Sequence, residues 1–188
     1  MKPEDELRHL LYSAYPGEEI EYPGLCIYVA ECPGNAEQVL QNCRDVLSVV
    51  LRQYEKPWPC DREWLQLLPK WFIERCAPER TDEEVEQDQE RFRQLSPEEQ
   101  AKEIDNEEWS VLEWIYWFDL SDDIRYWFWW GAIIEDCDTL LVAIKIVDWP
   151  IPYESFLWLL RASGAISVDE ILGDCDWDKF GTHLGGDV

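Results

Sequence analysis

An aromatic stretch in the second half of the chain constrains the fold more than any other feature. Eight of the twelve tryptophans lie between Trp109 and Trp158. Residues 125–134 and 139–147 are apolar runs of strand length, rich in aromatic and β-branched side chains and separated by four acidic or small polar residues. This pattern predicts a β-hairpin over residues 125–147 with a longer loop. Because the hairpin is apolar on both faces, we expect helices to cover it.

Other segments predict the elements that would surround this hairpin. The apolar run 25–30, enclosed by two Pro-Gly pairs, is a candidate third strand of the same sheet. Apolar residues recur at helical spacing in residues 3–15, 35–54, 61–76 and 153–162. A capping box is expected at Asn35 and Gln38, and Pro69 is expected to kink or divide its helix. Near the C-terminus, residues 167–170 predict the cap of a last short turn.

The chain length is typical of a single domain. With 188 residues, of which 46% are hydrophobic, the chain can enclose one sizeable core. We therefore predict one α+β domain over residues 1–172, with a small antiparallel sheet around the 125–147 hairpin, covered by helices. Residues 81–108 are predicted to form an acidic helical segment across the surface, and residues 173–188 are predicted to form a flexible acidic tail.

Acidic residues outnumber basic residues to an unusual degree. The chain has 41 aspartates and glutamates against 16 lysines and arginines, which gives a formal net charge of −25. Such a field repels nucleic acid and anionic membrane surfaces, so direct binding to either is not expected. It attracts basic proteins and speeds their capture. Residues 81–108 alone hold twelve acidic and three basic side chains, with capping boxes that begin at Thr81 and Ser96.

Cysteine and histidine usage argues for reduced thiols and against a metal site. The seven cysteines form no Cys-x-x-Cys pair, and the two histidines, His9 and His183, are far apart in the sequence. Residues 174–178 begin like a calcium loop, but Lys179 stands where that loop needs glycine. We therefore expect neither a metal nor a cofactor. The absence of a signal-peptide pattern and of a bilayer-length apolar run predicts a cytoplasmic protein.

The sequence contains no recognisable catalytic motif. A Gly-x-Ser-x-Gly elbow and a phosphate-binding glycine loop are absent, and neither histidine lies in a pocket-forming context. Three carboxylates among aromatic residues, Glu113, Asp119 and Asp148, could have pKa values raised by burial. The prediction is that the protein is not an enzyme, and the alternative is a carboxylate-based enzyme with a Trp-lined pocket. From the sequence alone, the tryptophans could form either a core or such a pocket.

The function that these features favour is protein binding. We expect an acidic immunity or inhibitor-type protein that occludes a basic partner, such as a toxin nuclease or another nucleic-acid-binding protein. The carboxylates expected to contact the partner are Glu83, Glu84, Glu86, Asp88, Glu90, Asp174, Asp176 and Asp178. The expected aromatic anchors are Trp58, Trp149 and Trp177, each beside proline or an acidic residue. Two further hypotheses are a DNA mimic and a protein whose acidic surface only keeps it soluble.

Three segments carry a resemblance to other proteins. They are Trp64-x-x-Leu-Leu-Pro-x-Trp-Phe72, Trp127-x-Trp-Trp130 with Asp138-Thr-Leu140, and Pro152-Tyr-x-x-Phe-x-Trp-Leu-Leu-Arg-Ala162. Together they resemble a group of uncharacterised, Trp-rich bacterial proteins, and the similarity covers about residues 60–165. This resemblance implies no activity, cofactor or site residue. In size, acidity and tryptophan content the chain is also similar to immunity proteins that neutralise bacterial toxins.

Overall fold

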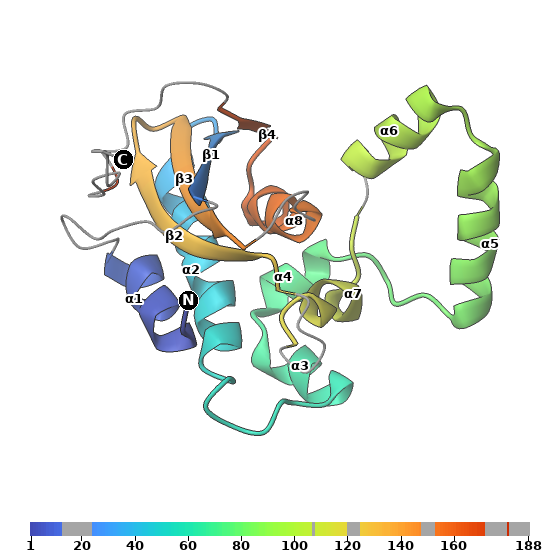
Figure 1. The fold of residues 1–188 in the computed structure, drawn as a ribbon, viewed down its shortest axis with the longest axis horizontal. Coiled ribbons are helices and arrows are strands. Elements are labelled where there is room, and N and C mark those ends of the chain that lie inside the picture. The colour runs from blue at the N-terminus through green and yellow to red at the C-terminus, as the bar shows by residue number, and fades with distance from the viewer. Residues whose placement is uncertain (13–23, 107, 120–124, 148–152, 172–179, 181–188) are drawn as a thin grey trace, which may run out of the picture.

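The computed structural model describes residues 1–12, 24–106, 108–119, 125–147, 153–171 and 180 (Figure 1). Within these ranges the helices are α1 (Pro3–Tyr12), α2 (Ala36–Leu51), α3 (Asp61–Leu67), α4 (Lys70–Arg75), α5 (Asp82–Gln94), α6 (Pro97–Asn106), α7 (Val111–Tyr116) and α8 (Glu154–Ser163). The strands are β1 (Gly24–Glu31), β2 (Trp127–Ile134), β3 (Thr139–Ile146) and β4 (Ser167–Glu170). Helices around a small antiparallel sheet make an α+β fold, which confirms the predicted fold class.

The four strands form one antiparallel sheet in the order β2-β3-β1-β4. β2 and β3 are the predicted hairpin, with Trp127 opposite Ile146, and β1 is the predicted third strand. A bulge between Trp129 and Gly131 interrupts the ladder of the hairpin. Because a bulge adds one residue to one strand, the alternation shifts beyond it, and Ala132 packs against the same core as Trp129.

Strand β4 corrects the prediction made for residues 167–170. These residues were expected to cap a short turn, but they pair with β1, and Ser167 lies opposite Glu31 in the ladder. The capping pattern is a local signal, whereas the available edge of β1 is a tertiary feature that the local sequence does not reveal. Strand pairing therefore outweighs the local preference.

The start of α2 corrects a second local prediction. Asn35 precedes the helix, but its side chain makes no capping hydrogen bond. The backbone N–H of Ala36 instead donates to the carbonyl oxygen of Cys137, in the loop of the hairpin. At Pro69 the prediction is confirmed, because the chain is divided there into α3 and α4.

The larger core lies between one face of the sheet and helices α2 and α8. Alternate strand residues such as Tyr28 and Ile144 point into it, where Leu47 of α2 and Phe156 of α8 pack against them. Six described tryptophans have at most 6% of their surface exposed, namely Trp64, Trp114, Trp127, Trp129, Trp130 and Trp158. These tryptophans therefore form a core and do not line an open pocket.

The other face of the sheet carries a smaller apolar cluster. Ile27, Trp130 and Leu141 point into it from the strands, and Phe180 completes it. Phe180 is 5% exposed although it belongs to the stretch predicted to be a flexible tail. The remainder of residues 173–188 lies outside the described residues. Helices thus cover one face of the hairpin as expected, whereas a side chain from the C-terminal stretch packs on the other.

Substitution of Phe180 by alanine should lower the free energy of unfolding by about 3 kcal/mol, because a buried aromatic ring is removed from above Gly131. Urea unfolding followed by tryptophan fluorescence measures this loss. Leu67→Ala, at a side chain that is 41% exposed, is the matched control and should change the same quantity by about 0.5 kcal/mol or less. Small and equal losses in both variants would contradict the packing of Phe180.

Helix α1 closes the outer edge of β2 with side chains instead of a neighbouring strand. The Glu6 carboxylate accepts a hydrogen bond of 2.8 Å from the backbone N–H of Trp129. His9 Nδ1 donates one of 2.8 Å to the carbonyl oxygen of Trp130. Glu6 also pairs with Arg125, and the two side chains are 0% and 3% exposed. Burial raises the pKa of Glu6, while Arg125 and the Trp129 N–H oppose that shift.

Substitution of Glu6 and substitution of Arg125 should lower the stability of the protein by different amounts. Glu6→Gln leaves a permanently charged guanidinium buried without a counter-ion and should lower the free energy of unfolding by about 3–5 kcal/mol. Arg125→Met should cost less, because the Glu6 carboxyl, whose pKa burial already raises, can take up a proton.

The cost of removing Arg125 should also depend on pH. A group with a raised folded-state pKa contributes stability below its unfolded-state pKa and loses it as the pH rises. The free energy of unfolding of Arg125→Met should therefore rise relative to that of the wild type as the pH is lowered from about 7 to about 5. Urea unfolding at both pH values is the measurement, and equal losses that do not depend on pH would contradict the asymmetry.

Candidate interaction site: the arm and the groove beside it

Residues 81–106, called the arm from here on, contain α5 and α6 and project from the body of the molecule (Figure 1). The 13 residues of α5 include two apolar side chains, Val85 and Phe92, and none of these residues is buried. So narrow an apolar face cannot hold a helix flat against a core. The helices occur where the capping boxes predict them, but the arm extends outward, whereas the sequence suggested helices lying across the surface.

Both helices of the arm begin with a capping box. The Thr81 and Glu84 side chains bond to each other's backbone N–H groups, and Ser96 and Glu99 do the same at the start of α6. Hydrogen bonds from the backbone N–H and hydroxyl of Thr81 lower the pKa of Glu84, and those from the Ser96 hydroxyl and N–H lower the pKa of Glu99. These two carboxylates therefore stabilise the first turns of α5 and α6.

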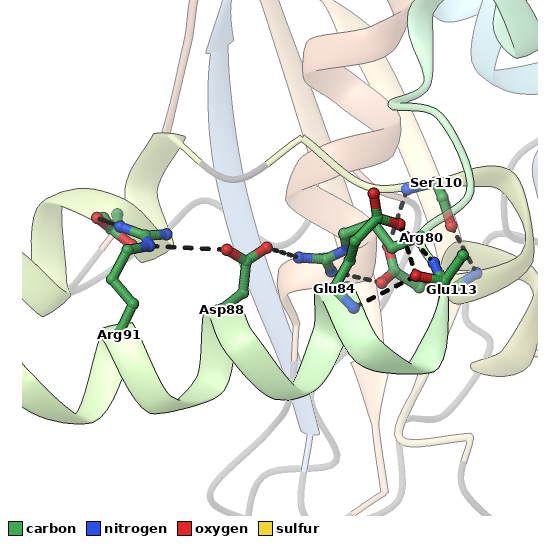
Figure 2. Close-up of polar contacts among 8 residues, drawn as sticks. Arg80, Glu84, Asp88, Arg91, Ser110 and Glu113 are labelled. Carbon is green, nitrogen blue, oxygen red and sulfur yellow. Dashed lines mark hydrogen bonds and ion pairs between the residues drawn. The ribbon is translucent and has the colours of Figure 1, made fainter.

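A chain of ion pairs joins the arm to α7. Figure 2 shows Arg91, Asp88 and Arg80 following one another along the arm towards Glu113. Asp88 lies 3.6 Å from Arg91 and 3.1 Å from Arg80, and Arg80 also pairs with Glu113 of α7. Arg91 reaches across to Glu103 of α6 at 2.6 Å. The hydrogen bond to Glu113 is the main reason why the pKa of Arg80 is raised.

Glu113 does not have the property that the enzyme hypothesis requires. Burial alone would raise the pKa of its carboxyl, but hydrogen bonds from Arg80 and from the Ser110 backbone N–H outweigh burial, so the pKa is lowered. The Ser110 hydroxyl caps the first turn of α7 in return, as Figure 2 shows. Glu113 is therefore a structural anion. Asp148, another carboxylate of that hypothesis, lies outside the described residues.

The structure divides the predicted contact carboxylates into two groups. Glu84 and Asp88 are engaged in the capping box and the ion pairs. Glu83, Glu86 and Glu90 are exposed and share another side of α5, because residues three and four apart lie on one helix face. Of these, Glu90 pairs with Arg93 at 3.3 Å, and both side chains are about two-thirds exposed, at 64% and 67%. The predicted contacts Asp174, Asp176 and Asp178 lie outside the described residues.

A groove lies between the arm and α7. It consists of two adjoining hollows of about 920 and 720 Å³, which share Arg80, Ile104 and Glu113 in their walls. Its apolar side chains are Val85, Phe92 and Ile104 from the arm and Trp109, Leu112, Tyr116 and Trp117 from the segment around α7. Tyr116 is 51% exposed and Ile104 is 44% exposed. An apolar surface is thus accessible beside the carboxylates of the arm.

These groove residues were not among the predicted contact residues. Trp58, one of the predicted anchors, is half-buried between Tyr54 and Trp64, with ring centroids at 5.3 and 4.9 Å. The anchors Trp149 and Trp177 lie outside the described residues. A usable signal was nevertheless present, since eight of the ten residues 109–118 are apolar, all except Ser110 and Glu113. A short helix of that kind must bury one side and present a second apolar side elsewhere.

Comparison of the chain with protein-family models, with curated proteins and with solved structures finds no match. None of the described helices is long and apolar enough to cross a membrane. In the described part of the chain, no group of three or more histidine, cysteine, aspartate or glutamate side chains is placed to hold a metal ion. The assignment of a site therefore rests on the geometry of the arm and the groove.

Acid should open the arm before it unfolds the body. Glu84, Glu99 and Glu113 all have lowered pKa values, so the stability that they contribute is present above the ordinary carboxyl pKa of 4.5. That stability is lost as the pH falls through the folded-state values. Hydrogen exchange, corrected for the intrinsic rate at each pH, should show the amides of α5 losing protection before those of α2.

The double variant Thr81→Ala/Ser96→Ala is the control for this prediction. It removes the two hydroxyl caps, so at neutral pH its arm should already exchange as fast as the wild-type arm does in acid. If α5 and α2 lost protection together in the wild type, the caps and ion pairs would not be what holds the arm.

Proposed function

We propose that the protein is a binding protein of the inhibitor or immunity type, in which the arm covers the cationic surface of a basic partner. The observation that carries this proposal is that α5 buries none of its side chains, although both arm helices are capped and tethered. Ordering a segment has an entropic cost, and the arm offsets little of it by core burial. A segment of this kind is best explained by what it contacts.

Electrostatics supports a basic partner. The chain carries a formal net charge of −25, and residues 81–108 hold twelve of its acidic side chains. Glu83, Glu86 and Glu90 stand exposed on one side of α5, where a cationic surface can approach them without breaking the capping boxes. Complementary charge speeds association and selects against acidic partners. The partner that fits is one with a cationic active site, such as a toxin nuclease, and the mechanism is occlusion of that site.

The cytoplasm is the proposed place of action. The six cysteines in the described part of the chain are free thiols. Three of them, Cys26, Cys32 and Cys43, are buried. Burial raises the pKa of the Cys26 thiol to about 11 and that of Cys43 to about 12, which keeps both thiols protonated and unreactive. Free thiols of this kind are typical of proteins in a reducing compartment.

Charge reversal on the arm tests the proposal. The triple variant Glu83→Lys/Glu86→Lys/Glu90→Lys should lose capture of basic proteins from an extract of the protein's own cells by about tenfold or more at low salt. The control triple, Glu37→Lys/Glu55→Lys/Glu74→Lys, changes the net charge by the same amount at exposed sites outside the arm and should retain capture. Equal losses in both variants would mean that net charge acts without the arm, and the proposal would fail.

A further inference from the structure

We infer that the groove between the arm and α7 receives one amphipathic α-helix of the basic partner, with the apolar side of that helix on the groove and its lysines or arginines along the margins. The inference rests on the proposed function and specifies which part of the partner is recognised. Three observations on the groove carry it: its lining, the state of its backbone groups and its charge.

The lining of the groove favours an apolar ligand surface. Trp117 lies between Trp109 and Tyr116, with ring centroids 6.1 and 6.2 Å away, so three aromatic rings form one continuous patch. Ile104 and Phe92 face the groove from the arm. Tyr116 and Ile104 remain about half exposed, at 51% and 44%. Contiguous exposed apolar side chains within a groove mark a contact surface, unlike single apolar residues scattered over a surface.

The backbone groups around the groove favour a helix over an extended peptide. The walls come from α5, α6, the segment around α7 and the first turn of α8, and none of the sheet strands contributes a residue. Helix backbones bond internally, and the starts of α5, α6 and α7 are closed by their capping boxes. Apart from the uncapped start of α8 at Glu154, the groove thus offers mainly side chains to a ligand. A ligand that satisfies its own backbone, namely an α-helix, fits such a site.

The charge of the groove favours a basic helix. Arg80 is held by Asp88 and Glu113, and Arg91 is held by Asp88 and Glu103, so these cations are already neutralised. Glu108 and Glu154 also line the groove and have no ion-pair partner among the described residues. Arg93 and Lys102 line the groove as well, so its walls carry five carboxylates against four cations, an excess of one negative charge beside an apolar floor. Lysines or arginines flanking the apolar side of a helix complement both features.

A synthetic helix provides the probe. It is a labelled peptide of about 18 residues, with leucine and tryptophan at positions i, i+3, i+4 and i+7 and lysine or arginine at the flanking positions. Three comparison peptides are a scrambled sequence of equal charge, a version interrupted by proline, and a version with glutamate in place of the basic residues. Fluorescence anisotropy with the full chain should show binding of the probe, and binding about tenfold or more weaker for each comparison peptide.

The variant Ile104→Ser/Tyr116→Ser removes apolar surface from the groove at side chains that are already exposed, so the fold should persist. It should weaken probe binding by about tenfold or more. The control Leu65→Ser/Ile166→Ser makes the same kind of change at side chains that are 42% and 68% exposed elsewhere, and binding should be unchanged. Circular dichroism of both variants verifies that they are folded.

The outcomes separate this inference from the proposed function. If the scrambled or proline peptide binds as well as the probe, or the groove variant binds it normally, the groove does not receive a helix and the inference fails. The proposed function would survive that result if charge reversal of Glu83, Glu86 and Glu90 still weakened the capture of basic proteins. If the glutamate peptide binds the groove as tightly as the basic probe, the preference for a basic partner is wrong and both proposals fail.

Discussion

The buried ion pair between Glu6 and Arg125 lies where the N-terminal helix meets the tryptophan-rich hairpin. An apolar strand with an open edge is a template for association with other chains. Here the Glu6 carboxylate occupies the N–H of Trp129, and His9 occupies the carbonyl group of Trp130, so the helix takes the place of a fifth strand. The two apolar clusters cover the two faces of the sheet, and α1 covers the edge of β2.

The rest of the molecule divides into a body held by burial and an arm held by polar contacts. Partly exposed ion pairs contribute only about 0–1 kcal/mol each, so the arm is far less stable than the core to which it is attached. Arg80 is the junction, since it pairs with Asp88 of α5 and Glu113 of α7. The arm can consequently change its position without disturbing the tryptophan core, a property compatible with the proposed binding of a partner.

Structural features that depend on residues close in the chain could be predicted from the sequence, and features that depend on distant residues could not. The hairpin, the strand character of residues 25–30 and the capping boxes at Thr81 and Ser96 could be predicted, because each depends on residues that are close in the chain. Strand β4, the burial of Arg125 and the packing of Phe180 could not, since each depends on a partner that is distant in sequence.

The candidate site was predictable to a similar degree. The acidic helices could be located from the sequence. That Glu84 and Asp88 make internal contacts while Glu83 and Glu86 stay exposed could not be predicted in this way. Helical periodicity gives the side of a helix on which a residue lies, not what that side meets. The groove beside α7 was missed for the same reason.

The distribution of tryptophan gives the two parts of the molecule different spectroscopic visibility. No tryptophan lies between Trp71 and Trp109, so intrinsic emission arises in the body and senses the arm helices only through Trp109 and Trp117 at the groove. Far-ultraviolet circular dichroism weights every helix alike. Melting curves from the two methods therefore need not superimpose, a mismatch ordinarily taken as the mark of a folding intermediate. In this chain, fraying of a tryptophan-free appendage would produce the same mismatch while the core melts in a single step.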